Sequence, residues 1–591
     1  MIRAEQAIAS GYAAFKRRDF VSARKALSGV KHPQAIHLLG LVEKAAGNFS
    51  DADKLLVRAA KLDPSNHEIA NNQGLLARTT GELERAEQSF HRALKLKPGF
   101  QSAEISLGRT LHDQGKHKEA IRILQNVVKR DPRITDAHTC IALAAIEERD
   151  IELAETHVTA ANAIAPTQIS VLNVRAAFEM ERGNYTVAED LFRSILSQGG
   201  TQADIHHMLS RALLMKPDPE AARAEAERAF KLAPTSEHLL FLADLYWMAG
   251  DISAFDDLVL RALDRPQIAI PAISLLRKAG REDSALAALT ETPTEIRESA
   301  AGLYLKCGLL LDLDRAEEAV RAGERAYAKD KWHRDPFHIV RALIATQKYK
   351  KALDIIMEAR ARDPEDQFWL GYEITVLRLM NDPKYNELID YDRHVQAYHL
   401  PVPEGFETID DFNRAFLEVL DELSPFDTEP LNQSLRSGSQ TPQNLCAVRN
   451  PVVQAYFRAL DKPIRNYMEA LGSTGDHPSS VRNTGEYRFS GAWSVNLTSG
   501  GYHVNHVHPK GWISSAYYVQ VPPETSAGAD KTGWIKFGEP PIETTPPLAP
   551  EKWVQPEAGL LVLFPSFLWH GTEPIKDGSV RVTAPFDVVP A

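Results

Sequence analysis

Four histidines gather near the C-terminal end of the chain in a pattern that suits a metal ion. The segment GGYHVNHVHPKGW contains His503, His506 and His508, and His570 lies 62 residues after His508, at the end of GLLVLFPSFLWH. Alternate residues of a strand face the same side, so His506 and His508 can point together while His570 reaches them from another strand. Two or three converging imidazoles suit a divalent transition metal. His503 would face the opposite side, and we interpret it as a surface or supporting histidine.

Polar residues on neighbouring strands could form a pocket beside these histidines. Arg581 lies in SVRVTAPF, where its guanidinium can bind a carboxylate through two hydrogen bonds. Thr583 is two residues further and shares the face of Arg581. Tyr517 and Tyr518 in AYYV face opposite sides of their strand. Asn496 either lines the same pocket or is an ordinary strand-end amide.

The segments that carry these residues are typical of an antiparallel β domain. GAWSVNLT, WISSAYYVQVP, GWIKFGE, GLLVLFPSFLWH and SVRVTAPFDVV are short, rich in aromatic and β-branched residues, and separated by turns with glycine and proline. Two helices are predicted between Phe412 and Leu471, on either side of the polar stretch NQSLRSGSQTPQN. The pattern predicts a jelly-roll sandwich or barrel.

The rest of the chain repeats with a fixed period. Turn prolines recur at Pro64, Pro98, Pro132, Pro166 and Pro234, at steps of 34, 34, 34 and twice 34 residues. Small residues recur with the same step, where two helices must cross closely. This period resembles the tetratricopeptide repeat, in which helix pairs stack into a superhelical solenoid with a concave groove.

These patterns predict an α + β multidomain protein. A tetratricopeptide-repeat solenoid is expected over residues 1–380, with clear repeats at about 35–235 and degenerate ones after them. Residues 381–410, with their prolines and a glycine, are expected to form a linker. Residues 411–591 are expected to form a double-stranded β-helix, or jelly-roll, domain.

Composition narrows the class of protein. The formal net charge of -11 argues against nucleic-acid binding. No segment approaches the roughly 20 apolar residues that cross a bilayer, and the first residues do not resemble an export signal. The three cysteines lie far apart, which favours a reducing compartment. We therefore expect a cytoplasmic protein without a membrane partner.

The order of histidine pair, tyrosine strand, histidine and arginine resembles the Fe(II)- and 2-oxoglutarate-dependent oxygenases. A bacterial and phage group of such oxygenases is more similar still, through HVHPKGWISSAYYV, GLLVLFPSFLWH and LNQSLRSGSQTPQNL. The resemblance covers roughly residues 400–591. It implies a 2-oxoglutarate-dependent non-haem iron dioxygenase that uses Fe(II), 2-oxoglutarate and O2.

The same resemblance assigns roles to the histidines. His506 and His570 match the two metal-binding histidines of the superfamily. His508 stands where most members have aspartate, and the more similar group also carries histidine there, so His508 is expected to be the third ligand. The alternative is that His508 points outward and water takes its place. Three imidazoles would also accept zinc, nickel or cobalt.

The cosubstrate residues follow from the resemblance too. Arg581 is expected to bind the distal carboxylate of 2-oxoglutarate, with a further hydrogen bond from Thr583. Tyr518 matches a position that often hydrogen-bonds the cosubstrate, and Tyr517 is then packed outside the pocket. Asn496 is a further candidate for cofactor binding.

The pairing of the two domains predicts a hydroxylase whose repeat groove captures a protein or peptide substrate. Two alternatives remain open: an oxygenase of small molecules or natural products whose repeats dock partner proteins, and a non-catalytic scaffold whose barrel binds metal. The oligomeric state is open, with a dimer as one alternative.

Overall fold

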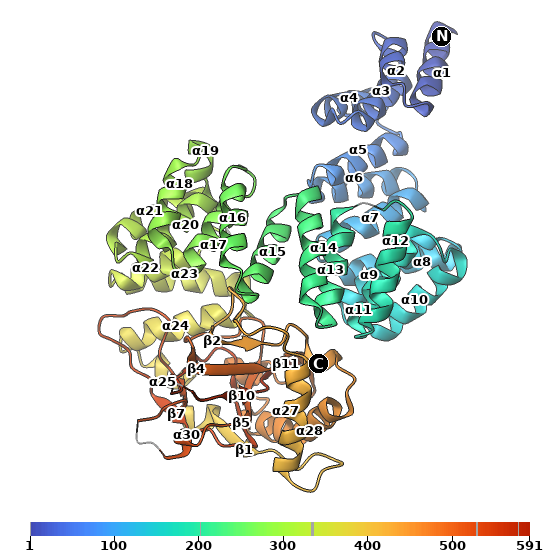
Figure 1. Ribbon diagram of the computed structural model, residues 1–591. Helices are drawn as coiled ribbons and strands as arrows, with labels where there is room; N and C mark the ends of the chain where they lie inside the picture. Colours follow the sequence, from blue (N-terminus) through green and yellow to red (C-terminus); the bar gives the residue numbers. More distant parts are fainter. Residues whose placement is uncertain (1, 201, 333–335, 528–529, 577) are drawn as a thin grey trace. The chain divides into compact units, whose positions relative to one another are not determined.

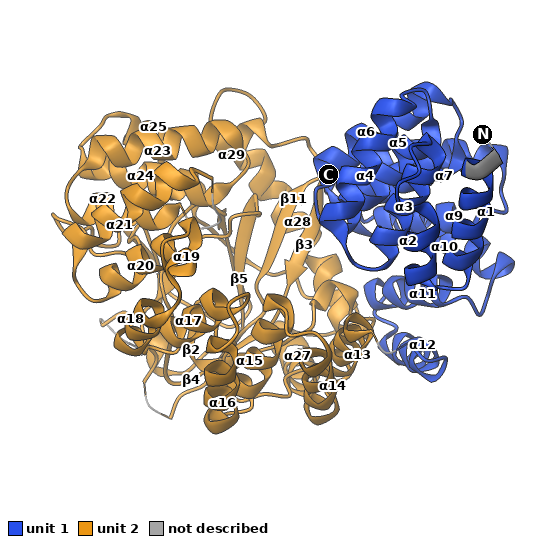
Figure 2. Cartoon of the chain, turned by 90° about the horizontal axis from the view of Figure 1, so that it is seen from above, with its two compact units in different colours: residues 1–200 blue, residues 201–591 orange. Residues whose placement is uncertain are grey.

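The computed structural model describes residues 2–591 except 201, 333–335, 528–529 and 577 (Figure 1). Contacts within the chain divide it into two compact units, residues 1–200 and 201–591 (Figure 2). The division falls inside the predicted solenoid, because the later helices pack together with the C-terminal β domain. No helix in the described part of the chain is long and apolar enough to span a bilayer.

The first unit is a series of antiparallel helix pairs. Glycines at the 34-residue step let the helices of a pair touch: a Cβ atom on Gly74 would lie 2.6 Å from Phe90, and one on Gly108 would lie 2.6 Å from Leu124. The repeat spacing therefore fixes the close approach of the helices. The helices are α1 (Ile2–Lys16), α2 (Phe20–Leu27), α3 (Pro33–Ala45), α4 (Phe49–Leu62), α5 (His67–Thr79), α6 (Leu83–Leu96), α7 (Gln101–Asp113), α8 (His117–Arg130), α9 (Thr135–Glu147), α10 (Ile151–Ile164), α11 (Ile169–Glu181) and α12 (Tyr185–Ser197).

Helix pairs continue into the second unit and confirm the predicted N-terminal solenoid. The sequence pattern weakens after Pro234, yet the pairing of helices continues to α24. These helices are α13 (Ala203–Met215), α14 (Pro219–Leu232), α15 (Ser236–Met248), α16 (Ile252–Leu263), α17 (Ala269–Lys278), α18 (Glu282–Glu291), α19 (Thr294–Arg297), α20 (Ala300–Asp312), α21 (Ala316–Lys329), α22 (Phe337–Ala345), α23 (Tyr349–Arg362) and α24 (Gln367–Leu379).

Two antiparallel sheets form the β domain, in agreement with the predicted fold class. The larger sheet has the order β1-β8-β5-β10-β4-β2, with β11 pairing β5 and β3, and the smaller has the order β7-β6-β9. The strands are β1 (Gln396–His399), β2 (Leu435–Gln440), β3 (Tyr487–Ala492), β4 (Val495–His503), β5 (Ile513–Gln520), β6 (Ile535–Phe537), β7 (Lys552–Val554), β8 (Leu560–Pro565), β9 (His570–Thr572), β10 (Arg581–Thr583) and β11 (Phe586–Pro590).

Helices cover one face of the larger sheet. Helices α27 (Ile409–Glu422) and α28 (Pro451–Leu471) contribute Phe412, Phe416 and Tyr456 to a core that also contains Tyr517 and Val582 from the strands. The opposite face of the sheet turns toward the smaller sheet. The remaining short helices of the domain are α25 (Lys384–Leu388), α26 (Tyr391–His394), η1 (Leu445–Ala447), α29 (Pro478–Val481) and α30 (Glu524–Ala527).

Two stretches predicted to be irregular form strands instead. The expected linker 381–410 supplies β1, which pairs with β8 from Gln396↔Leu563 to His399↔Leu560. The polar stretch between α27 and α28 supplies β2, which pairs with β4 across an irregular register near Ser437. Both strands are short and are held by backbone hydrogen bonds to distant segments. Their own residues therefore show no pattern from which a strand could be predicted.

The last solenoid helix is built into the β domain through Trp569. The Trp569 side chain is 4% exposed, and its Nε1–H donates to the Gly371 carbonyl at 3.0 Å and to the Thr375 hydroxyl at 2.9 Å, both in α24. The rings of Phe368 and Tyr372 pack at 6.3 and 5.3 Å from the Trp569 ring. Helix α24 therefore braces the residue that precedes His570.

Arg378 of the same helix holds a second segment of the β domain. Its guanidinium donates to the carbonyl oxygens of Gly538 at 2.8 Å and Ala549 at 2.9 Å. At the other end of α24, the Gln367 N–H donates to the Pro509 carbonyl at 2.9 Å, one residue beyond His508. The helix thus ties together the loops on both sides of the histidines.

Trp569→Phe should lower the free energy of unfolding by about 1–3 kcal/mol, because the Gly371 carbonyl and the Thr375 hydroxyl lose a buried donor. Urea unfolding of the full chain measures the change as a lower midpoint. Trp332→Phe is the matched control, since the Trp332 side chain is 37% exposed. Equal midpoints in the two variants would contradict the bracing role of Trp569.

Candidate metal centre

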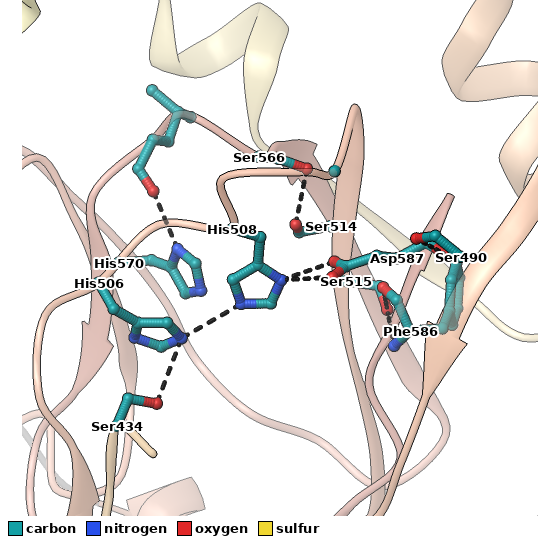
Figure 3. Close-up of polar contacts among 12 residues, drawn as sticks. Ser434, Ser490, His506, His508, Ser514, Ser515, Ser566, His570, Phe586 and Asp587 are labelled. Atoms are coloured by element: carbon teal, nitrogen blue, oxygen red, sulfur yellow. Dashed lines mark hydrogen bonds and ion pairs between the residues drawn. The ribbon is translucent and has the colours of Figure 1, made fainter. Parts of the chain in front are cut away.

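Backbone hydrogen bonds bring His506, His508 and His570 to one place. The N–H of His506 donates to the His570 carbonyl at 2.9 Å, and the N–H of His570 donates back at 3.0 Å, which forms an isolated antiparallel bridge. The N–H of His508 donates to the Ser566 carbonyl at 3.0 Å. One ring nitrogen from each histidine lies within 4.8 Å of the others (Figure 3). The structure thus joins the three histidines that the sequence singled out.

The ring protons are placed by the partners of the Nδ1 atoms. Nδ1 of His506 lies 2.8 Å from the Val504 carbonyl, and Nδ1 of His570 lies 2.9 Å from the Leu568 carbonyl. A carbonyl only accepts, so each Nδ1 carries the proton and each Nε2 presents its lone pair. Nε2 of His506 faces Nε2 of His508 at 3.2 Å. Lone pairs converging in this way repel one another unless a cation lies between them, which fits a metal ion.

Burial keeps the rings of His506 and His570 uncharged. Loss of hydration, together with the neighbouring His508, lowers the pKa of His506 to about 3. Burial also holds the pKa of His570 well below its ordinary value, with further lowering by His506 and His508. The neutral imidazole is the form that binds a metal ion. At pH 7 the rings of His506 and His570 are therefore ready to act as ligands.

Asp587 joins the cluster through His508 and was not found by sequence reasoning. Its two carboxylate oxygens lie 2.6 and 2.7 Å from Nδ1 of His508, and both side chains are nearly buried, at 14% and 13% exposed. The carboxylate fixes the Nδ1–H tautomer of His508 and makes Nε2 a stronger electron donor. The sequence did offer one indication of Asp587: it is an acidic residue inside the apolar run PFDVV of the last strand.

His503 lies beside the cluster rather than in it. Its Nδ1 is 3.0 Å from the Ser434 hydroxyl oxygen, which also lies 3.3 Å from Nε2 of His506. Its backbone N–H donates to the Thr572 hydroxyl at 2.9 Å. Burial holds the pKa of His503 well below its ordinary value, so the ring is neutral. His503 is thus a supporting residue of the site.

Arg581 is buried without a carboxylate partner. The side chain is 2% exposed, Nη1 donates to the Gly533 carbonyl at 2.7 Å, and Nε has no hydrogen-bond partner among the described residues. Its guanidinium carbon lies 5.8 Å from the ring centre of Tyr518, whose buried hydroxyl also lacks a partner in the described chain. A buried, unpaired guanidinium is costly, so this arrangement fits an incoming carboxylate.

Thr583 and Tyr518 are register partners across β10 and β5 and therefore share a face. On the other side of β10, Arg581 and Thr583 pair with Leu497 and Val495 of β4. The face that carries Arg581 thus also carries Thr583 and Tyr518. Tyr517 points the other way, as expected, and its hydroxyl donates to the Asn413 side chain at 2.6 Å.

Asn496 does not join Arg581. It pairs with Val582, which packs in the helix-covered core, so Asn496 lies on the opposite face of the sheet from Arg581 and Thr583. The strand period of two decides this, because Asn496 follows Val495 by one residue and Arg581 precedes Val582 by one. The structure therefore corrects the expectation that Asn496 lines the pocket.

Comparisons with known protein families divide the chain in the same way as its sequence. Residues 491–587 match the family described as "Putative 2OG-Fe(II) oxygenase". Tetratricopeptide-repeat families match residues 37–99 and 179–237, and residues 77–143. The oxygenase match includes all three clustered histidines, Arg581 and Asp587.

Solved structures similar to the chain include two tetratricopeptide-repeat proteins and yeast Tom70. A tetratricopeptide repeat protein from Parabacteroides merdae is 16% identical, with 39% of this chain and 94% of that chain covered and a TM-score of 0.36. A thermophilic TPR protein from Thermus thermophilus is 21% identical, with 31% and 100% covered and a TM-score of 0.29. Yeast Tom70 is 14% identical, with 65% and 98% covered and a TM-score of 0.34. No curated protein matches the chain.

Asp587→Asn should weaken binding of Co(II) by about 10–100-fold. The neutral amide would hold the His508 ring less firmly than the carboxylate and would carry no negative charge to strengthen Nε2 as an electron donor. Competition titration of the full chain against a coloured chelator measures the affinity. Asp410→Asn is the matched control, since Asp410 is exposed in the first turn of α27.

Repeating the Asp587→Asn change in a His508→Asp variant separates the effect of the Asp587 carboxylate on His508 from a general loss of structure. In His508→Asp, the change Asp587→Asn should no longer weaken Co(II) binding, because an aspartate has no N–H for the Asp587 carboxylate to hold and the two carboxylates repel. An equal loss of affinity in both backgrounds would show that Asp587 acts only as a structural residue.

The metal-free chain should lose stability as the pH falls below 6.5. His506 has a pKa of about 3 in the fold and 6.5 when exposed, so the unfolded chain binds the proton first. The free energy of unfolding then falls by up to about 1.4 kcal/mol per pH unit for each such imidazole. Urea unfolding at pH 7.5, 6.5 and 5.5 measures the slope. His506→Gln should make it shallower and the exposed His91→Gln should not; identical slopes would contradict the buried neutral state.

Proposed function

Because the chain carries tetratricopeptide repeats and a C-terminal domain of the 2OG-Fe(II) oxygenase family, we propose that it is an Fe(II)- and 2-oxoglutarate-dependent dioxygenase that hydroxylates a protein or peptide. The single observation that carries the proposal is the pair of complementary, incomplete sites in one β domain. Three imidazole lone pairs converge on one point, and the buried Arg581 guanidinium has a donor with no hydrogen-bond partner in the described chain. A scaffold without activity would not require both.

The metal would be held by Nε2 of His506, His508 and His570. When bound, Fe(II) and 2-oxoglutarate together activate O2 for attack on an unactivated C–H bond. The chain's own part is to present three neutral nitrogens from one side. The Asp587 carboxylate returns, through His508, the negative charge that an aspartate ligand would have supplied directly.

The cosubstrate would be oriented by the buried face of β10 and β5. Arg581 is suited to hold a carboxylate through two N–H donors, and Tyr518 and Thr583 on the same face offer hydroxyl groups. The loss of hydration on burial lowers the pKa of Arg581. An anionic partner would offset this loss by stabilising the charged guanidinium.

Aromatic side chains cover His570, the buried histidine of the cluster. The ring of Phe564 lies 4.5 Å from the His570 ring, and that of Phe537 lies 6.3 Å from it. Trp569, the residue before His570, is buried against α24. A dry site strengthens the electrostatic contacts of both the metal and the cosubstrate.

A polypeptide substrate is supported by the extent of the solenoid. Stacked repeats present a long concave surface of the kind that usually binds peptides, and a small metabolite would not need it. In the competing proposal the repeats dock partner proteins while the oxygenase acts on a small molecule. Dependence of 2-oxoglutarate consumption on added peptide would separate the two.

Anaerobic addition of Fe(II) and 2-oxoglutarate should give a visible charge-transfer band, which His570→Ala should abolish.

Arg581→Lys should weaken 2-oxoglutarate binding by about 10–100-fold while Fe(II) still binds, because lysine keeps the charge and loses the paired donors. The absorbance titration measures both constants. Arg488→Lys, an exposed residue of β3, is the matched control. No band in the native chain, with zinc or no metal bound, would end the iron and 2-oxoglutarate proposal.

A further inference from the structure

A cleft of about 950 Å³ opens beside the histidine cluster. Its wall includes His503 and Asn505 from the segment that leads into His506, and Thr572 and Glu573 from the segment that follows His570. The His503 ring centre lies 5.8 Å from that of His506. Both segments that carry cluster histidines thus continue into the cleft wall, so a molecule in the cleft would lie next to the metal ligands.

Acidic side chains dominate the charge of this cleft. Glu539, Glu543 and Glu573 face a single ammonium group, that of Lys536. Lys536 Nζ lies 2.6 Å from Glu539 and 3.5 Å from Glu573, so its charge is already shared between two carboxylates. Asn505 adds a neutral donor to Glu539 at 2.9 Å, and Glu543 is exposed. The cleft keeps an excess of two negative charges.

Much of the remaining wall is apolar. Ile542 and Leu548 lie in the lining together with prolines such as Pro540 and Pro547. Pro540 is buried, while Ile542 and Leu548 are half-buried and pack against the helical core cluster that contains Trp569. An aliphatic wall beside carboxylates suits a side chain with a hydrocarbon stem and a cationic head.

We propose that this cleft binds the substrate polypeptide and that the bound segment carries a lysine or arginine side chain. The inference rests on the proposed hydroxylase function, which it deepens by naming the class of substrate. The stem lies along Ile542 and Leu548, and the cationic head is held by Glu543 and Glu573. The substrate backbone would then lie beside the histidine cluster, because His503 and Asn505 of the cleft wall lead into His506.

Binding of a fluorescently labelled hexalysine peptide to the metal-free full chain tests the cleft. Fluorescence anisotropy at 0.15 M salt should give saturable binding. Glu543→Gln combined with Glu573→Gln should weaken it by at least about fivefold, since the charge contacts of one exposed and one half-buried carboxylate are lost. Glu407→Gln combined with Glu422→Gln removes the same charge from exposed positions outside the cleft and should change the affinity less than twofold.

The outcomes separate this inference from the proposed function, because the measurement needs neither iron nor 2-oxoglutarate. Absence of saturable binding overturns the cleft proposal even if the charge-transfer band is present. An equal loss in the control pair also overturns it, since the attraction would then belong to the net charge of the whole chain. Displacement of hexalysine by Nα-acetyl-lysine amide with equal affinity would support the cationic class and assign the cleft to a small amine.

Discussion

The convergence of three imidazole lone pairs in a buried space is the constraint on which the β domain depends. The Nδ1 atoms of His506 and His570 face carbonyl oxygens, and that of His508 faces the Asp587 carboxylate, so no ring can turn without breaking a buried hydrogen bond. The His506–His570 backbone bridge fixes the distance between β9 and the segment that carries His506. The rings are therefore arranged before any metal arrives, and little reorganisation is needed for binding.

The two charges of the site are balanced at different places. In the proposed site His508 would be a neutral ligand, and the Asp587 carboxylate contacts the opposite nitrogen of the His508 ring. Arg581 needs an anion from outside, because its Nε has no partner in the described chain. Metal and anion would thus complete one another's surroundings, which is the physical reason for treating both as parts of one proposed active site.

The solenoid and the metal centre share a helix. Helix α24 accepts the Trp569 N–H and holds the segments at Gly538 and Ala549 through Arg378, so the last repeat forms one wall of the β domain. The acidic cleft lies on the same segments, between the strand ends and the proline-rich stretch after Glu539. The last solenoid helix and the acidic cleft are thus connected through neighbouring residues, Gly538 and Glu539.

The sequence by itself determined the features that depend on local periodicity and on residue type. The 34-residue step predicted the helix pairs, and the order of motifs singled out His570 and Arg581. Strand alternation predicted that His506 and His508 could face one way; they do converge, but from the irregular segment between β4 and β5 and not from a regular strand. Only the tertiary structure decided that Asp587 backs His508, that Asn496 faces away from Arg581, that residues 396–399 form a strand, and that α24 braces Trp569. Each of these is a pairing between segments distant in sequence, and such pairings are set by register and packing that no local pattern records.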